Sequence, residues 1–495
     1  MASLEELQAR LGRVWSMNQP GRTEEHVVVE LPSFSLAPSM MAHYRTRLVP
    51  LEHRYLVAML QLAGIPGCEL VFVTSAHPGE RVLDYYAGFL PEQLRHSVRS
   101  RMHVVVVPCI EPLPVAVALL QRPEALEQIA AIVADLPAMI EPWNVTAAEV
   151  AVAERLGLPI NGTAPGLWSL GFKSAARRVF HETGVPTPVG QEDVHDLADV
   201  ARAVRRIRRA HPGARGVVVK HDNSGAGDGN LVIDLRDAKG NEVPRAALRG
   251  YIARVMPDWY RVDLAAGGVV EELVSGSSFA SPSAQVDISP EGAVVVLSTH
   301  EQVLSGERGQ VYTGCRFPAE PAYAAVLARH AQAVGERLAQ EGARGRLGVD
   351  FVAVRRRRQW DVFAIEVNLR RGGTTHPFTV LRSLVPGHYD VEAGVWVATA
   401  DGTARFYSAT DNMLDPAWRA LDPAAAIDAV CSAGLTFDPA SGTGVVLHML
   451  SDLAVHGRCG LTAIGVTPGD AERLAEQTRL ALDAVSRQRV ASGLS

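Results

Sequence analysis

The alternation of apolar and polar positions divides the chain into regions that favour different kinds of sheet. In residues 1–165, short apolar runs that fit buried strands alternate with longer segments of helical periodicity. The apolar runs are Val27–Leu31, Leu70–Thr74 and Val104–Pro108, and the helical segments include Leu51–Leu62 and Arg122–Leu136. Strands that alternate with helices are typical of a parallel sheet covered by helices. We therefore expect an α/β domain over residues 1–165.

From about residue 166 to 385, the predicted strands follow one another with few helices between them. A helical segment starts at Lys173, and a long one spans Pro321–Gln340. The strand-like runs are Val217–Lys220, Leu231–Asp234, Gly268–Val274, Ser283–Ile288 and Ala293–His300, and a hairpin across residues 349–368. This order favours an α+β arrangement with antiparallel sheets.

The length of the chain agrees with this division. At 495 residues it exceeds what one hydrophobic core usually supports, so several domains are expected. The segment Gly162–Gly166, which contains a proline, is typical of a linker. Residues 386–495 form a smaller mixed region that ends in a predicted helix at Asp470–Arg487. We therefore expect domain boundaries near residues 165 and 385.

The predicted hairpin carries three oxygen-bearing side chains on one face. Strand alternation puts Glu366 and Asn368 on the same side, and a turn centred near Arg358 puts Asp350 directly across from Glu366. Two carboxylates and an amide on an apolar sheet face are unfavourable unless a cation lies between them. Such oxygen ligands suit Mg²⁺, whose shell is commonly completed by nucleotide phosphates. The pattern predicts a magnesium site; the alternative is a solvated sheet face, or Asn368 as a cap of the turn.

Lysine is scarce in this chain, which draws attention to each one. The sequence contains three lysines, Lys173, Lys220 and Lys239, against 45 arginines. A compact ammonium suits a phosphate as a point charge. Lys173 starts a predicted helix, and Lys220 ends the strand before a glycine-rich loop. Either lysine alone fits a surface position, but the pair favours contacts with nucleotide phosphates.

The glycine-rich loop joins two predicted antiparallel strands. Its candidate phosphate-binding residues are Ser224, Gly225, Gly227 and Gly229. The loop lacks the order of a P-loop, and a strand follows it, which argues against dinucleotide binding. Glycines between two strands can form a flap whose backbone N–H groups close over phosphates. The alternative is a plain mobile loop.

Two further segments carry candidate site residues. The strand end with Glu271, Glu272 and Val274 could present its backbone to an adenine edge, as a hinge between two lobes does. Directly after the hairpin, Arg370 could stabilise charge that develops on a phosphorylated or tetrahedral intermediate. The candidates that follow are Arg371 and His376, although a packed, hydrogen-bonded histidine is an equal alternative for His376.

Composition excludes several classes of partner. A net charge of −6 and a pI near 6.3 give no electrostatic reason to expect nucleic acid or an anionic membrane. No stretch approaches the roughly 20 apolar residues of a membrane span, and the start of the chain has no signal-peptide pattern. The five cysteines are scattered, so we expect neither disulfides nor structural zinc, and the expected location is the reducing cytoplasm.

Taken in order, these features resemble the ATP-grasp superfamily over some 200 residues. The matching positions are Lys173, Lys220 with its glycine flap, the hinge at Glu271–Val274, Asp350, Glu366, Asn368 and Arg370. The string EVNLRRGGTTHPF, residues Glu366–Phe378, is similar to the subgroup that contains the pheganomycin-type peptide ligases. The leading α/β domain is similar too, so the resemblance covers most of the chain.

The resemblance implies an architecture in three parts. A pre-ATP-grasp α/β domain would span residues 1–165, and an ATP-grasp domain would span 166–385. The latter would comprise a flap lobe at about 166–270 and a metal-site lobe at about 271–385. A small mixed C-terminal domain would follow at 386–495.

The resemblance also implies an activity. Such ligases use ATP and Mg²⁺ to phosphorylate a carboxylate, and an amine then displaces phosphate to give an amide, ADP and phosphate. The substrates would be an amino acid or related acid and an amine such as an amino acid or peptide. Arg370 would stabilise the acyl phosphate and its adduct, with Arg371 and His376 as candidate carboxylate anchors. The family also suggests a homodimer.

Two other functions fit the same scaffold, and one family feature is missing. A small-molecule kinase would leave a stable phosphorylated product, and a regulatory protein would bind nucleotide without turnover. Many ATP-grasp enzymes have an acidic ribose contact just after the hinge, where this chain has Ser275–Ser278. Candidates for that contact are Gln285, Asp287 and Glu301.

Overall fold

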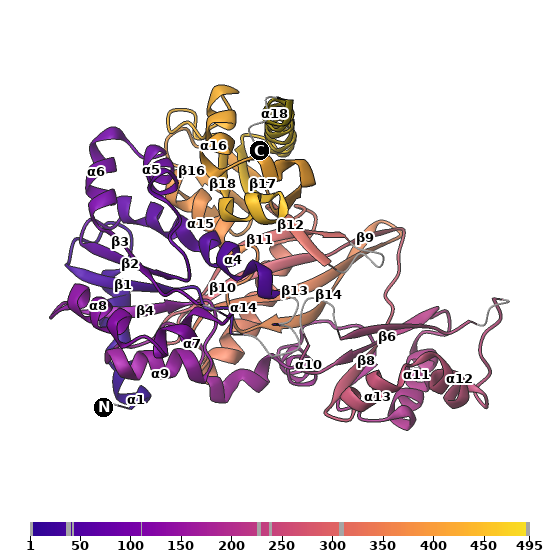
Figure 1. Ribbon diagram of the computed structural model, residues 1–495. Helices are drawn as coiled ribbons and strands as arrows, with labels where there is room; N and C mark the ends of the chain where they lie inside the picture. Colours follow the sequence, from indigo (N-terminus) through magenta and orange to yellow (C-terminus); the bar gives the residue numbers. More distant parts are fainter. Residues whose placement is uncertain are drawn as a thin grey trace.

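The computed structural model describes residues 3–35, 41, 44–109, 111–224, 229–236, 240–305 and 311–491. Three sheets organise the fold: a parallel sheet near the amino terminus, a small antiparallel sheet at the far side of the molecule, and a large antiparallel sheet between them (Figure 1). The mixed α/β and α+β class expected from the sequence is confirmed. In the described part of the chain, no helix is long and apolar enough to cross a membrane.

The amino-terminal sheet has four parallel strands in the order β3-β2-β1-β4. They are β1 (His26–Leu31), β2 (Cys68–Thr74), β3 (Met102–Val106) and β4 (Ala138–Pro142). Helices cover it, namely α5 (Glu80–Gly88), α6 (Glu92–Ser100), α7 (Val115–Leu120), α8 (Pro123–Val133) and α9 (Ala147–Leu156). The helix expected at 51–62 begins as α4 (Leu48–His53) and continues as the 3-10 helix η2 (Arg54–Ala63).

The small antiparallel sheet belongs to the expected flap lobe. Its order is β5-β8-β6-β7, with β5 (Gly190–Gln191), β8 (Gly268–Glu272), β6 (Gly216–His221) and β7 (Asn230–Asp234). Helices α11 (Leu197–Ala210), α12 (Leu248–Val255) and α13 (Asp258–Leu264) share a hydrophobic core with it. Helix α10 (Lys173–Glu182) connects the lobes, because it packs against both β8 and strand β14 of the large sheet.

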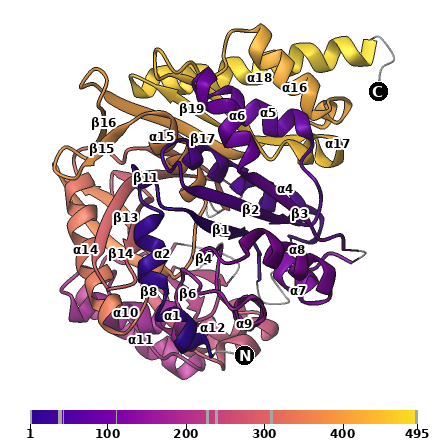
Figure 2. The ribbon, with the colours of Figure 1, turned by 90° about the vertical axis from the view of Figure 1, so that its left-hand side faces the viewer.

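The large sheet has eleven strands among the described residues, and its main path is β14-β13-β10-β11-β12-β17-β16-β15. Its strands are β9 (Ser278–Ala280), β10 (Pro282–Ile288), β11 (Val294–Ser305), β12 (Val311–Phe317), β13 (Gly345–Arg356), β14 (Gln359–Asn368), β15 (Gly387–Asp390), β16 (Val395–Ala398), β17 (Ala404–Leu414), β18 (Gly444–His448) and β19 (Arg458–Gly465). Helices α14 (Ala324–Gln340), α15 (Thr375–Leu384), α16 (Pro423–Ser432) and α18 (Pro468–Ala491) pack around it, and α18 lies along β17 and β19 (Figure 2).

The large sheet crosses the expected boundary at residue 385. Strand β17 from the carboxyl-terminal region pairs with β12, with Cys315 opposite Ala409. One hydrophobic core also joins the amino-terminal region to the carboxyl-terminal one, from Leu56 to Tyr407 and Ile464. The boundaries at 165 and 385 therefore stay predictions, and the region after 385 shares its sheet with the region before it.

The register of the β13–β14 hairpin sets up the site. Asp350 lies opposite Glu366, as the sequence predicted. The turn lies at Arg357 and Arg358, and a bulge between Asp350 and Phe351 shifts the pairing by one residue. Without that bulge, the pairing that runs from the turn would place Asp350 opposite Ile365. The bulge is therefore part of how the two carboxylates face each other.

Candidate active site

A cavity of about 440 Å³ lies between the flap sheet and the large sheet. Most of the predicted site residues line it: Lys220, Glu271, Glu272, Val274, Asp350, Glu366, Asn368 and Arg370. A second, smaller cavity of about 100 Å³ shares Glu366, Asn368 and Arg370 with the first and adds Ser224. The folded chain thus brings together residues that are up to 150 positions apart in the sequence.

The oxygen-bearing side chains of the hairpin form one face of this cavity. Asn368 Nδ2 donates to Asp350 Oδ2 at 2.9 Å, and Gln302 Nε2 donates to Asp350 Oδ1 at 2.7 Å. Burial and the nearby charge of Glu366 raise the pKa of Asp350 to about 7. Asp350 forms no ion pair with the described residues, and the hard oxygens of the two facing carboxylates together with the Asn368 amide fit Mg²⁺. The donor set therefore suits the metal that the sequence predicted.

Lys173 lies at the first residue of α10 and points toward the hairpin. Its Nζ is 3.5 Å from Glu366 Oε1 and donates to the Ser224 carbonyl oxygen at 2.6 Å. The side chain is buried, so its charge acts in a medium that screens it weakly. Lys173 therefore joins the base of the glycine loop to the predicted metal face.

Lys220 is held by Glu271 rather than by the hairpin. Its Nζ donates to Glu271 Oε2 at 2.5 Å, while Arg177 Nη1 donates to Glu271 Oε1 at 2.5 Å. Burial alone would raise the pKa of Glu271, but the charges of Lys220 and Arg177 hold that pKa below its usual value. The Glu271 side chain thus orients a lysine, in addition to any contact that its backbone makes.

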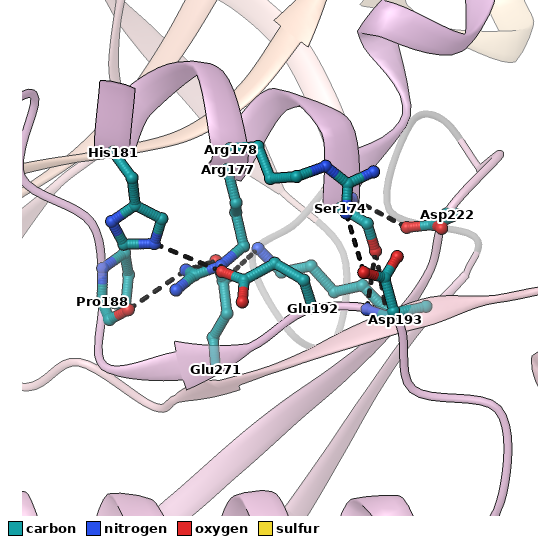
Figure 3. A network of polar contacts seen from close by, with 11 residues as sticks. Ser174, Arg177, Arg178, His181, Pro188, Glu192, Asp193, Asp222 and Glu271 are labelled. Atoms are coloured by element: carbon teal, nitrogen blue, oxygen red, sulfur yellow. Dashed lines mark hydrogen bonds and ion pairs between the residues drawn. The ribbon is translucent and has the colours of Figure 1, made fainter. Parts of the chain in front are cut away.

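Arg177 is a residue that the sequence reasoning missed. Its guanidinium also donates to Glu192 Oε1 at 2.7 Å and to the Pro188 carbonyl oxygen at 3.1 Å (Figure 3). It is nearly completely buried on α10. Arg177 and Lys173 are four residues apart, so they lie on the same helix face. That spacing was the one signal in the sequence that could have indicated it.

The glycine loop is described only at its two ends. Ser224 Oγ donates to the His221 carbonyl oxygen at 3.0 Å, and a Cβ on Gly229 would lie 2.3 Å from that Oγ. Gly229 therefore allows the two ends of the loop to approach closely. The predicted Gly225 and Gly227 lie outside the described residues.

The three predicted catalytic residues lie in different places. Arg370 lines both cavities, with its guanidinium carbon 5.1 Å from the centre of the Trp143 ring, and it forms no ion pair with any described residue. Arg371 points away from them and forms ion pairs at 2.5 Å with both Glu30 and Glu141 of the amino-terminal sheet.

The third of these residues, His376, is buried behind the cavity wall. Its Nε2 lies 3.0 Å from Asp411 Oδ1 and 3.1 Å from His448 Nε2. Neither Arg371 nor His376 lines the two cavities, so their contact with the reacting groups stays a prediction. Adjacent residues in a turn point in different directions, and only Arg370 faces the cavity.

The three candidates for the ribose contact also lie in different places. Gln285 lines the main cavity. Asp287 faces Arg346 at 3.5 Å, and Glu301 accepts hydrogen bonds from the Tyr323 hydroxyl and the Glu320 amide. Gln285 is the one of the three that a bound nucleotide or substrate could reach in this cavity.

Comparison with known proteins identifies the fold. A family described as "IQCH-like, ATP-grasp" matches residues 254–392, and one described as "PGM1 C-terminal domain" matches residues 425–478. The N5-carboxyaminoimidazole ribonucleotide synthetase in complex with ADP aligns with a TM-score of 0.52 at 12% identity, over 94% of this chain and 98% of its own. The biotin carboxylase domain of Hydrogenobacter thermophilus 2-oxoglutarate carboxylase gives 0.52 at 12% identity, over 92% and 89%. These structures share the ATP-grasp fold.

The sequence relatives are more specific. L-propargylglycine–L-glutamate ligase of Streptantibioticus cattleyicolor is 30% identical over 418 residues, which are 82% of this chain and 84% of that enzyme. IQ motif-containing protein H of Danio rerio is 23% identical over 338 residues, 57% of this chain but 32% of that protein. Fold and site thus define an ATP-grasp enzyme. The chain belongs to the ATP-grasp carboxylate–amine ligases, in the pheganomycin-type peptide ligase subgroup, and the class of reaction is ATP-dependent amide formation.

Proposed function

We propose that the chain activates the carboxylate of an amino acid as an acyl phosphate and joins it to the amine of a second amino acid or a peptide. One observation carries this proposal: two facing carboxylates, the buried Lys220 and an arginine without a carboxylate partner among the described residues line one cavity. The relative from Streptantibioticus cattleyicolor is named for two amino acids, which supports amino acids as both substrates.

In this proposal the hairpin residues hold the metal. Asp350, Glu366 and Asn368 would bind Mg²⁺, which would neutralise negative charge on the ATP phosphates during transfer of the γ-phosphoryl group. The raised pKa of Asp350 supports the assignment, because a cation between the two carboxylates would relieve their repulsion. Lys173 and Lys220 would contact the phosphates, each from a position that is already fixed by hydrogen bonds.

The proposed ligation has two chemical steps. A carboxylate oxygen attacks the γ-phosphorus and ADP leaves; the amine nitrogen then attacks the acyl carbon, phosphate leaves with that oxygen, and the amine loses a proton. Negative charge grows on the acyl oxygen in the second step, and Arg370 would stabilise it. An acyl phosphate hydrolyses readily, so the residues at the base of the glycine loop, Ser224 and Gly229, would serve a flap that excludes water.

A homodimer is a further part of the proposal. It rests on the family resemblance and on the description of one structural neighbour as a domain dimer. Light scattering of the purified chain tests it: a mass near twice 53.1 kDa supports a dimer, and a mass near 53.1 kDa contradicts it.

The test of the function is a screen of paired amino acids and peptides with MgATP. We expect phosphate release only when an acid and an amine are both present, with the amide detected by mass in equal amount. If the acid carries ¹⁸O in its carboxylate, one labelled oxygen should appear in the released phosphate. A stable phosphorylated product without free phosphate would instead indicate a kinase, and tight ATP binding without any product would indicate a regulatory protein.

A further inference from the structure

The far end of the main cavity holds a cation that no sequence motif indicates. Arg54, the first residue of η2, lines the cavity and is the only described residue before position 166 that does so. Tyr312 and the Gly372–Thr375 turn line the same end. A Cβ on Gly373 would lie 2.4 Å from Tyr312 Cε1, so the tyrosine ring lies directly on this turn. Arg54, from the amino-terminal region, thus lines the same cavity as the turn that follows Arg370.

The guanidinium of Arg54 is held firmly in place. Its Nη1 donates to Asp411 Oδ2 at 2.6 Å, and Nε has no hydrogen-bond partner among the described residues. Its central carbon lies 5.5 Å from the Phe34 ring centre and 5.3 Å from that of Tyr55. An arginine held against two aromatic rings loses little entropy when it binds an anion, and its planar shape matches a carboxylate.

Asp411 compensates the charge of Arg54 only in part. Its second oxygen, Oδ1, lies 2.9 Å from His448 Nε2 and 3.0 Å from His376 Nε2. Burial lowers the pKa of His376 to about 3, so the ring is neutral and can donate its Nε2–H to the carboxylate. The carboxylate thus distributes its charge over three donors, and the guanidinium keeps positive potential toward the cavity.

His376, His448 and Asp411 also have the spacing of a metal site. Their surroundings instead favour a structural role in which they hold Arg54 in place. Arg54 already occupies one oxygen of Asp411, and a divalent cation beside it would leave excess buried positive charge. Histidines that bind metals normally donate their other N–H group to an acceptor. Here Nδ1 of both rings lacks a partner among the described residues, which suits an unprotonated acceptor better than a stranded N–H.

Two polar groups on β10 line the same cavity. Ser283, which lies opposite Asp350, and Gln285 are buried, and neither Ser283 Oγ nor Gln285 Oε1 has a partner in the described part of the chain. Gln285 Nε2 donates to the Thr374 carbonyl oxygen at 2.9 Å, which fixes the amide so that Oε1 is left as an acceptor. A zwitterionic amino acid requires both kinds of group: its carboxylate binds a cation, and its ammonium donates to acceptors of this kind.

We propose that Arg54 binds the unreacted carboxylate of an amino-acid substrate, and that Asp411, His376 and His448 are positioning residues for it. This inference rests on the proposed ligase function. The carboxylate has two possible sources: the α-carboxylate of the amine substrate, or a second carboxylate on the acid that is activated. Both require the same recognition chemistry, and the experiment separates them.

The experiment compares wild type with Arg54→Met and Arg54→Lys on the best substrate pair, using each substrate and its carboxamide analogue. For Arg54→Met we expect KM for one substrate to rise about 10- to 100-fold, with KM for ATP unchanged. Wild type should lose a similar factor when that substrate's carboxylate is amidated, whereas Arg54→Met should be indifferent to the amidation. The substrate that shows this coupling is the source. Arg22→Met, which removes an exposed arginine, serves as the control.

The positioning role has its own readout. His376→Asn should raise the same KM about 3- to 10-fold without changing KM for ATP, and should add nothing in the Arg54→Met background. If Arg54→Met does not fold, the double variant Arg54→Met with Asp411→Asn removes the cation without leaving a stranded carboxylate. An Arg54→Met variant, single or double, that still discriminates carboxylate from carboxamide as strongly as wild type, for both substrates, would overturn the inference. Failure of the proposed function would look different, because wild type itself would then form no amide.

Discussion

The two ends of the cavity differ in whether their buried charges are paired. At the hairpin end, Asp350 and Glu366 face each other, and the pKa of Asp350 rises to about 7. At the far end, burial would raise the pKa of Asp411, but His376 and Arg54 hold it well below its usual value. Asp350 accepts hydrogen bonds from two neutral amides and forms no ion pair with the described residues, whereas Asp411 is already paired with Arg54. A carboxylate without an ion pair, rather than acidity alone, indicates where a cation can bind.

The same contrast separates two adjacent arginines. Arg370 lines the cavity and forms no ion pair with the described residues, while Arg371 is paired with Glu30 and Glu141. Arg371 thereby joins the turn after the hairpin to the amino-terminal sheet. We expect substitution of Arg371 to act mainly on stability and substitution of Arg370 to act on catalysis.

The largest effect on stability should come from Arg371→Met. It removes the ion-pair partner of the buried Glu30 and of the half-buried Glu141, so the free energy of unfolding should fall by about 3–5 kcal/mol. Urea unfolding measures this, and Arg371→Lys should recover part of the loss because it keeps the charge. A change below about 1 kcal/mol would mean that the two ion pairs add no net stability.

Lys173→Met and Lys220→Met test the proposed phosphate contacts of two lysines that form ion pairs with Glu366 and Glu271, respectively. Each should lower kcat for ADP formation by about 10²–10³-fold, because each removes a positioned cation from the phosphate site. Lys239→Met is a matched control, since it removes the third lysine of the chain. If all three substitutions had equal and small effects, the scarcity of lysine would carry no functional meaning.

Gly373→Ala tests how the Gly372–Thr375 turn packs at the far end of the cavity. Its Cβ would meet the Tyr312 ring at 2.4 Å, so we expect a loss of about 1–3 kcal/mol in the free energy of unfolding as the ring is displaced. Gly372→Ala is the matched control, because its Cβ would lie 3.9 Å from the nearest atom, Thr374 Oγ1. Equal unfolding midpoints for the two variants would contradict the packing described here.

The stability of the fold should also depend on pH. Burial lowers the pKa of His53 to about 4 and that of His300 to about 3. These rings bind protons in the unfolded chain below pH 6.5 but not in the folded one. The free energy of unfolding should therefore fall as pH drops below 6.5, by about 1.4 kcal/mol per pH unit for each ring. His300→Asn should reduce the slope measured by urea unfolding between pH 6.5 and 4 by one proton; an unchanged slope would contradict it.

Local patterns in the sequence predicted the parts of the fold and site that depend on neighbouring residues. Strands β1 to β3, helix α14 and the pairing of Asp350 with Glu366 follow from periodicity and turn position. The bulge that completes this pairing left no local signal, because β-bulges depend on how the strand packs. Even so, the predicted hairpin was enough to locate the oxygen face of the cavity.

Contacts between distant segments were not predictable in the same way. The sheet continues from β12 to β17 across about 90 residues, and no periodicity marks such a pairing. Arg54 meets Asp411 from 357 residues away, and Arg371 meets Glu30 from 341 residues away. Which of two neighbouring arginines faces the cavity depends on partners of this kind, and this is why Arg371 was assigned to the site and Arg54 was missed.

The most direct test of the central claim is ADP formation by Glu366→Gln, measured with MgATP and a productive substrate pair. The substitution keeps the shape of the side chain but removes one of the two facing charges. We expect kcat to fall by at least about 10³-fold while the unfolding midpoint stays unchanged. Asp361→Asn, an exposed carboxylate on the same strand, should leave kcat unchanged. Near-normal turnover in Glu366→Gln would contradict the assignment of the hairpin as the metal site.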